Sequence, residues 1–397
     1  GGDHLLKVLL AAAVFACAAV SFAASSTRPA TPGGGTTDLR MMWSLGKCQG
    51  TGPIRLKASP IRIEDLKSIT PMGLMVGGHV TPSDHLGMQS SKELFDVVAP
   101  ADGFIVAIQL RNMPTLDPAN PGEKHEYQII IEHSCTFWTF LDLINELDPM
   151  ILKAVAGAPE AGVSGSREIT GGPASHFRIP VKAGQVLGVV RGKHGIDFAV
   201  VNTEVTLAGF VVPAHYNSYP AKIHTVDPFD YYDEPLKSRM LEFNPRKTAP
   251  RGGKIDYDVD GRLIGNWFLE GTNGLAGSGR DRRLYWKNHL SIVYHHIDAS
   301  KITVSMGDFG GTARQYWVKG NSPDPAVVSE TTGIVKYELV WAAIGSNGQA
   351  FAGRDERVQG ILLAQVMPGR KARIEAFPGK TASEVKGFTA NAKIFER

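Results

Sequence analysis

Residues 77–86 read Gly-Gly-His-Val-Thr-Pro-Ser-Asp-His-Leu, and the rest of the chain is organised around this stretch. It places two imidazoles, those of His79 and His85, and the carboxylate of Asp84 within seven residues. Histidine and carboxylate side chains are groups that bind zinc in proteins. The glycine pair before them lets the backbone bend tightly enough to aim these side chains at a common point. The stretch therefore predicts a metal site.

The composition is that of a globular protein with more than one domain. Of its 397 residues, 43% are hydrophobic and 20% are charged. A chain of this length usually divides into two domains. The net charge is only +3, and no run of lysine or arginine occurs. Nucleic acid is therefore not expected as a partner, because phosphate binding needs concentrated positive charge.

The first 24 residues predict a secretory signal peptide. They combine a lone lysine, an apolar core and small residues at the exit. We therefore expect a protein that is secreted, periplasmic or held at the cell envelope. Two alternatives stay open: the apolar run is retained as a membrane anchor, or Cys17 carries a lipid, because residues 14–17 loosely match a lipobox. Membrane contact is expected only through such an uncleaved signal or lipid anchor.

Composition also suggests boundaries in the rest of the chain. Residues 25–68 begin with a Pro-, Thr- and Gly-rich run and predict a flexible tether and arm. Residues 69–225 are mostly strand-like, with one helix predicted over 137–155 from its apolar spacing. Repeated X-Pro steps at 226–250 predict a linker. Short, closely spaced strands over 251–397 predict an antiparallel barrel or a sandwich, so the expected fold class is mostly β.

Removal of the first 24 residues leaves two cysteines, Cys48 and Cys135. Two cysteines in an exported chain suit one disulfide, which would tie the arm to the first domain. Two unpaired buried thiols are the alternative.

Several segments of the first domain resemble the lysostaphin-type (LytM-like) zinc metalloendopeptidases. Besides the stretch 77–86, they are residues 99–107 (Ala-Pro-Ala-Asp-Gly-Phe-Ile-Val-Ala), 130–133 (Ile-Ile-Glu-His), 181–188 (Val-Lys-Ala-Gly-Gln-Val-Leu-Gly) and 195–200 (Gly-Ile-Asp-Phe-Ala-Val). The similarity covers roughly residues 70–205. It implies a small antiparallel β fold, a duplicated hybrid motif, with a shallow groove.

The resemblance implies zinc ligands at His79 and Asp84. The spacing between these two residues is one longer than in the family, so His85 is an alternative to Asp84. The family's third ligand is the second histidine of a His-x-His pair, and that position is Asp197 here. Three mixed nitrogen and oxygen ligands are chemically sufficient for zinc. The sequence favours an inert, hydrogen-bonded groove, and zinc bound by these residues is the alternative.

The two catalytic positions of the family lack histidine in this chain. The first histidine of the His-x-His pair is replaced by Gly195, and the other catalytic histidine falls near residues 140–143, where Asp142 is the titratable group. The reaction needs a base that takes a proton from a zinc-bound water near neutral pH. Glycine has no such base, and aspartate is a weaker one than histidine. The sequence therefore predicts a degenerate active site.

The second domain resembles lipocalin-like barrels over about residues 255–397. Residues 263–269 read Leu-Ile-Gly-Asn-Trp-Phe-Leu and match the Gly-x-Trp opening strand of those barrels. The resemblance implies that Gly265 permits close backbone approach, that Trp267 closes the barrel floor, and that Arg373 on a late strand packs against it. A barrel of this size holds one small ligand. A sandwich with a core tryptophan is the alternative.

These features together predict an exported, non-catalytic binding protein of the cell envelope. Its partner would be a cell-wall polymer, an envelope protein or a small hydrophobic ligand. Two other functions stay open: a zinc-dependent endopeptidase that acts on cell-wall peptides, and a carrier of a small hydrophobic ligand through the C-terminal barrel.

Overall fold

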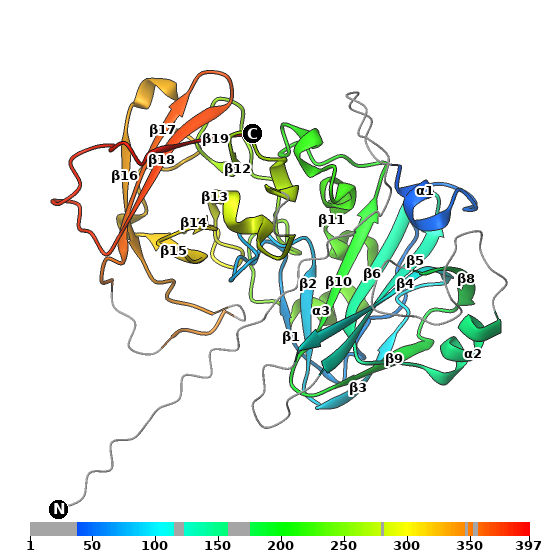
Figure 1. Ribbon diagram of the computed structural model, residues 1–397. Coiled ribbons are helices and arrows are strands. Elements are labelled where there is room, and N and C mark those ends of the chain that lie inside the picture. Colours follow the sequence, from blue (N-terminus) through cyan, green and yellow to red (C-terminus); the bar gives the residue numbers. More distant parts are fainter. Residues whose placement is uncertain (1–37, 115–122, 158–174, 279–281, 346–347, 352–355) are drawn as a thin grey trace, which may run out of the picture.

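The computed structural model describes residues 38–114, 123–157, 175–278, 282–345, 348–351 and 356–397. Within them the fold is mostly β, with antiparallel sheets followed by a closed antiparallel barrel of eight strands. Figure 1 shows the barrel, coloured yellow to red, beside the blue-to-green sheets. The predicted signal peptide (1–24) and the start of the predicted tether (25–37) lie outside the described residues. No helix within the described ranges is long and apolar enough to span a membrane.

The first part of the chain forms a large sheet and a small one. The large sheet has the order β1-β2-β10-β6-β5-β4-β8, with β11 beside β10, and the small sheet has the order β3-β9-β7. The strands are β1 (Leu66–Thr70), β2 (Leu86–Ser90), β3 (Leu94–Val98), β4 (Gly103–Pro114), β5 (Glu123–Ser134), β6 (Phe137–Ile144), β7 (Glu146–Leu147), β8 (Ser175–Val181), β9 (Val186–Arg191), β10 (Ile196–Asn202) and β11 (Thr225–Val226). The helices here are α1 (Leu39–Ser44), α2 (Pro149–Gly157) and α3 (Leu236–Leu241), with 3-10 turns η1 (Pro213–Tyr216), η2 (Pro220–His224) and η3 (Pro228–Tyr231).

Strand β5 shows that the large sheet is covered on both faces. Successive side chains of a strand point to opposite faces. Ile129 and Ile131 join the main core together with residues of the small sheet, whereas Ile130 joins a second cluster that contains Trp43 of α1. Both faces are therefore apolar, and the central strands carry continuous hydrophobic runs.

This double coverage explains why the helix predicted over residues 137–155 is wrong over most of its length. Residues Phe137–Ile144 form β6, and the helix α2 begins only at Pro149. A strand that is buried on both faces has apolar residues at nearly every position, so a helical spacing is found in it by chance.

The N-terminal arm packs onto the sheet from residue 38 onward. Trp43 of α1 is buried edge-on against Trp138 of β6, with ring centroids 5.7 Å apart. Cys48 and Cys135 form the predicted disulfide, which fixes the arm to the end of β5. Aromatic burial and a covalent cross-link together hold this segment on the sheet.

Residues 226–250, expected as a linker, also pack into the core. Phe229, Tyr232 and Met240 are buried in the main hydrophobic cluster of the sheets. The X-Pro steps that suggested a linker shape turns, since η3 and α3 each begin beside a proline. The prolines make the backbone of this segment irregular, but the segment still packs against the sheets.

The second part of the chain is an up-and-down barrel. Its strands are β12 (Gly265–Leu269), β13 (His289–Tyr294), β14 (Ile302–Met306), β15 (Arg314–Val318), β16 (Val335–Val340), β17 (Gly360–Met367), β18 (Lys371–Pro378) and β19 (Lys393–Glu396), with turns η4 (Gly274–Ala276), η5 (Arg282–Asn288), η6 (Lys319–Asn321) and η7 (Glu330–Thr332). Each strand pairs with the next, and β19 pairs with β12 to close the ring. Alternate residues such as Leu290 and Ile292 of β13 point inward and fill the interior with apolar side chains.

Gly265 and Trp267 both lie in a close-packed part of the barrel wall. Gly265 has φ +126°, and a Cβ at this position would lie 2.2 Å from Oδ1 of Asp258, so only glycine fits. The Trp267 indole is buried in the barrel core, and its Nε1 donates to the carbonyl of Leu263 at 2.8 Å. These contacts fix the start of β12.

The arginine that covers Trp267 is Arg397, not Arg373. The Arg397 guanidinium lies 4.0 Å from the Trp267 ring centroid. It also donates to the carbonyl of Val259 at 2.7 Å. Arg373 lies over Phe388 instead, because its neighbours on β18 point into the barrel and alternation turns Arg373 outward.

We predict that Arg397→Met lowers the free energy of unfolding by roughly 3–5 kcal/mol, because it leaves the buried carboxylate of Asp258, 3.6 Å away, without its partner. The matched variant Arg373→Met removes only a cation–π contact and should cost about 1 kcal/mol or less. Urea unfolding followed by tryptophan fluorescence measures both. Equal losses in the two variants would contradict this assignment.

Candidate functional site

Strand register gathers the sequence-predicted site from distant parts of the chain. Asp84 and His85 directly precede β2, and β2 pairs with β10 so that Gly87 lies opposite Asp197. Strand β10 in turn pairs with β6, which puts Asp197 opposite Asp142. Three strands therefore bring one histidine and three carboxylates to the same region of the sheet.

His85 and Asp197 form an ion pair. Nδ1 of His85 lies 3.2 Å from Oδ1 of Asp197, and the two side chains are 13% and 16% exposed. Burial disfavours the charged imidazolium, but the neighbouring carboxylates, Asp197 first and then Asp84 and Asp142, outweigh it and raise the pKa of His85 to about 9. His85 is therefore positively charged at neutral pH.

His79 is the neutral partner in this cluster. Its ring centroid lies 5.8 Å from that of His85. Burial, reinforced by the charge on His85, lowers the pKa of His79 to about 4. Among the described residues its buried Nε2 has no hydrogen-bond partner. The two histidines of the motif thus differ in charge state because only one of them pairs with a carboxylate.

Lys222 of η2 belongs to the site and was not found from the sequence. Its ammonium donates to the carbonyl of Pro82 at 2.5 Å and lies 3.9 Å from Oδ1 of Asp84. Burial lowers the pKa of Lys222, and Asp84 opposes that shift. Lysine is absent from zinc motifs and this one lies in an irregular segment, so no local pattern points to it.

The two positions that the resemblance assigns to catalytic histidines are constrained by contacts with neighbouring strands and backbone. Asp142 accepts from Nε2 of Gln128 at 3.2 Å and from the backbone N–H of Leu143 at 2.7 Å. At Gly195 a Cβ would lie 2.0 Å from the carbonyl oxygen of Met88 on β2. No side chain fits at position 195 unless the strands separate.

The barrel contacts the start of the stretch 77–86. Gln315 of β15 exchanges two hydrogen bonds with the backbone of Gly77, each 3.1 Å long. The indole of Trp286 in η5 packs against Gly78. The stretch 77–86 is therefore held between the large sheet and the barrel.

The residues as arranged do not fit a resident zinc ion. In the part of the chain that the structure describes, no group of three or more His, Cys, Asp or Glu residues is placed to hold a metal. Of the four expected ligands, His85 and Asp197 pair with each other and Asp84 lies beside Lys222. The zinc site stays a prediction that this geometry does not favour.

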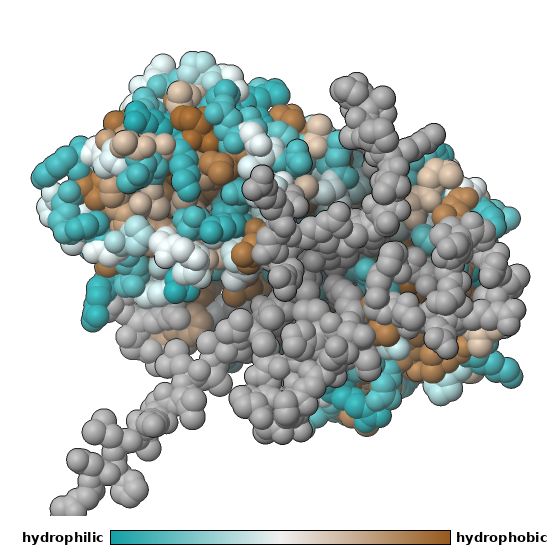
Figure 2. Space-filling view, viewed as in Figure 1, coloured by the Kyte–Doolittle hydropathy of each residue, from teal (hydrophilic) through white to brown (hydrophobic). Residues whose placement is uncertain are grey.

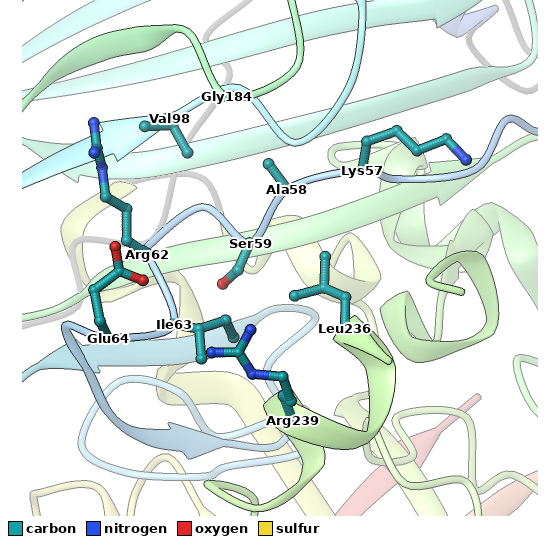
Figure 3. Close-up of a pocket in the computed structure, with 10 residues that line it drawn as sticks. All are labelled: Lys57, Ala58, Ser59, Arg62, Ile63, Glu64, Val98, Gly184, Leu236 and Arg239. Atoms are coloured by element: carbon teal, nitrogen blue, oxygen red, sulfur yellow. The ribbon is translucent and has the colours of Figure 1, made fainter. Parts of the chain in front are cut away.

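A separate pocket of about 320 Å³ lies between the arm, α3 and the turn at Gly184. Figure 3 shows the Ser59 hydroxyl and the Arg239 guanidinium directed toward the space beside Ile63. A second cavity, of about 450 Å³, opens beside Trp267 and Arg397 at the barrel floor. Neither pocket includes a residue of the 77–86 stretch.

Comparisons with protein-family models, with curated proteins and with solved structures give no match. The likeness to lysostaphin-type peptidases and to lipocalins thus depends on the motifs quoted from the sequence.

We predict that stability falls on both sides of about pH 6.5. The folded-state pKa of His85, about 9, exceeds the ordinary value of 6.5, so its contribution is complete below pH 6.5 and is lost as the pH rises through 9. The folded-state pKa of His79, about 4, is depressed, so its contribution is lost as the pH falls from 6.5 through 4. Each of these two histidines should contribute roughly 3 kcal/mol to its limb.

Urea unfolding at pH values from 4 to 10 measures both limbs. His85→Gln should flatten the alkaline limb. His176→Gln is the control: burial lowers the pKa of His176, so this histidine should affect only the acidic side. An unchanged alkaline limb in His85→Gln would contradict the ion pair with Asp197.

Proposed function

We propose that this chain is an exported, non-catalytic binding protein of the cell envelope, built on a degenerate peptidase-like fold. The close approach at Gly195 is the observation that carries the proposal. The backbone of β10 lies so near Met88 that position 195 has no room for the imidazole that the peptidase reaction needs. Replacing Gly195 by histidine would therefore not restore the catalytic group, because the packing of β10 against β2 leaves no room for a side chain there.

The remaining polar groups support the same conclusion. Asp142 accepts hydrogen bonds from an amide and a backbone N–H, and an aspartate is a weaker base than the histidine that the reaction uses. His79 is neutral but lies in a site where His85 and Lys222 already supply positive charge. A hydrolytic water would find neither a metal-holding group of residues nor a free imidazole pair in the described cluster.

The pocket of Figure 3 offers a place for a ligand. Ser59 is 4% exposed and its hydroxyl has no hydrogen-bond partner among the described residues, which is unusual for a buried polar group. Arg239 forms no ion pair within the described part of the chain, and Leu236 and Val98 give the pocket apolar walls. These features suit a small carboxylate that carries an apolar group, such as the end of a peptide. A volume of 320 Å³ is at the lower end for ligand sites.

A second candidate function is transport of a small hydrophobic ligand at the barrel. Phe309, Tyr316 and Trp341 form an aromatic row at the end of the barrel away from Trp267, with ring centroids 5.1 and 4.9 Å apart. Trp341 is 36% exposed. Elsewhere on the barrel, Figure 2 shows separate hydrophobic patches, in brown, among hydrophilic residues. Because apolar side chains fill the barrel interior, such a ligand would rest on this rim.

We predict that the purified protein cleaves neither glycine-rich nor cell-wall-derived peptides, with or without added zinc, because no base is placed to activate water. Mass spectrometry of the peptides after prolonged incubation is the measurement. His79→Ala serves as the matched control. Cleavage by the wild-type protein that disappears in His79→Ala would establish the endopeptidase function instead.

We predict that N-acetyl amino acids with apolar side chains bind the pocket of Figure 3 through their carboxylates. Arg239→Gln should weaken binding by about tenfold or more, since a charged hydrogen bond is lost. Arg40→Gln, which removes an exposed arginine of α1, should leave binding unchanged. Isothermal titration calorimetry measures all three proteins. Binding that is equal in both variants would exclude this pocket.

A further inference from the structure

Lys222 is a buried cation that lies outside the segments on which the peptidase resemblance depends. Its side chain is only 5% exposed, and that of Asp84 is 12% exposed. Buried lysines are rare unless a carboxylate and hydrogen bonds compensate for the lost hydration. Lys222 has both, in Asp84 and in the carbonyl of Pro82. Two of its contacts therefore lie inside the stretch 77–86.

The ammonium lies where the motif meets the barrel. Burial is the main cause that lowers the pKa of His79 in the motif and that of His289 on β13, and the nearby charge of Lys222 adds to both shifts. Electrostatic influence of this kind is strong only at short range in poorly hydrated surroundings. Lys222 is therefore close enough to act on both the motif and the barrel wall.

The cations and carboxylates of the cluster form ion pairs with each other, without a metal. Lys222 lies beside Asp84, and His85 pairs with Asp197, so each of two cations has its own carboxylate. A zinc ion bound to Asp84 would put two further positive charges a few ångströms from an ammonium. Such repulsion in a buried site is severe, so metal and ammonium exclude each other.

Two donor atoms remain that a metal would use. The buried Nε2 of His79 and Oδ2 of Asp84 have no hydrogen-bond partner among the described residues. A histidine nitrogen and a carboxylate oxygen form the start of a zinc site, and Asp197 or His85 would complete it. In the described arrangement these donors do not form a group of three around a metal, since Asp84 lies beside the ammonium of Lys222 and His85 pairs with Asp197.

We propose that the ammonium of Lys222 is the resident cation of this site: it holds Asp84 in place of a metal ion and keeps zinc out. The inference goes beyond non-catalytic binding, because it assigns the charge balance at Asp84 to one side chain. It also predicts that removal of that side chain's charge turns the cluster into a metal site.

Lys222→Met and Lys222→Gln test the proposal. Glutamine keeps a donor for the Pro82 carbonyl and removes only the charge, so it serves if the methionine variant does not fold. After chelator treatment, each protein is titrated with zinc and analysed for bound metal by mass spectrometry. We expect the wild type to retain no zinc, and both variants to bind one zinc per chain at least about tenfold more tightly than the wild type.

Two further variants make this result specific. His79→Ala in the Lys222→Gln background should abolish the new zinc binding. Lys254→Gln, which breaks the Lys254–Asp256 pair of 2.7 Å outside the cluster, should gain none. Stoichiometric zinc in the chelator-treated wild type, or zinc binding by Lys222→Gln no tighter than that of the wild type, would overturn the proposal.

A double-mutant cycle measures the compensation directly. Lys222→Gln should lower the melting temperature by about 5 °C or more, because Asp84 becomes an uncompensated buried charge. Adding Asp84→Asn should restore at least half of that loss. Additive losses would mean that Lys222 does not neutralise Asp84, and the proposal would fall while the absence of peptidase activity could still stand. Zinc and peptide cleavage together in the wild type would refute both.

Discussion

The register of β2, β10 and β6 is the constraint on which the candidate site depends. It sets Asp197 opposite Gly87 on one side and opposite Asp142 on the other, and it presses Gly195 against the backbone of Met88. A shift by one residue would turn every side chain of β10 to the other face of the sheet. The same pairing that collects three carboxylates therefore also removes the space for a catalytic imidazole.

Charge balance follows from that arrangement. Carboxylates collected in a poorly hydrated region must be protonated, paired or bound to a metal, because an isolated buried charge is very costly. This chain supplies His85 for Asp197 and Lys222 for Asp84, and it supplies amide hydrogen bonds for Asp142. The pairs use side chains from the sheet and from η2, so the electrostatics of the site depend on segments far apart in the sequence.

Local patterns in the sequence predicted the elements whose signals are local. The Gly-x-Trp start of β12, the spacing of the barrel strands and the cysteine pair all appear in the structure. The failures have one physical cause: tertiary contacts that no local pattern reports. Residues Phe137–Ile144 looked helical because both faces of β6 are covered. The proline-rich segment 226–250 resembled a linker because its apolar residues are sparse, yet Phe229, Tyr232 and Met240 are buried.

The candidate site divides in the same way. The sequence identified His79, Asp84, His85, Asp142, Gly195 and Asp197, which the register brings to one region. It could not identify Lys222, whose position depends on the path of an irregular segment, nor could it choose Arg397 over Arg373, since that choice depends on which face of a strand each residue occupies. A sequence motif identifies residue types, whereas the contact partner of each residue depends on how the chain folds in three dimensions.

The contacts between the sheets and the barrel also determine whether the two parts can be separated. Phe268 and Leu275 belong to the hydrophobic core of the sheets, and the hydroxyl of Tyr216 accepts a hydrogen bond from Asn266 of β12 at 3.0 Å. Cutting the chain near residue 250 would strip apolar surface and polar partners from both halves at once. The sheets and the barrel are therefore not interchangeable modules, because a different barrel would have to reproduce these contacts.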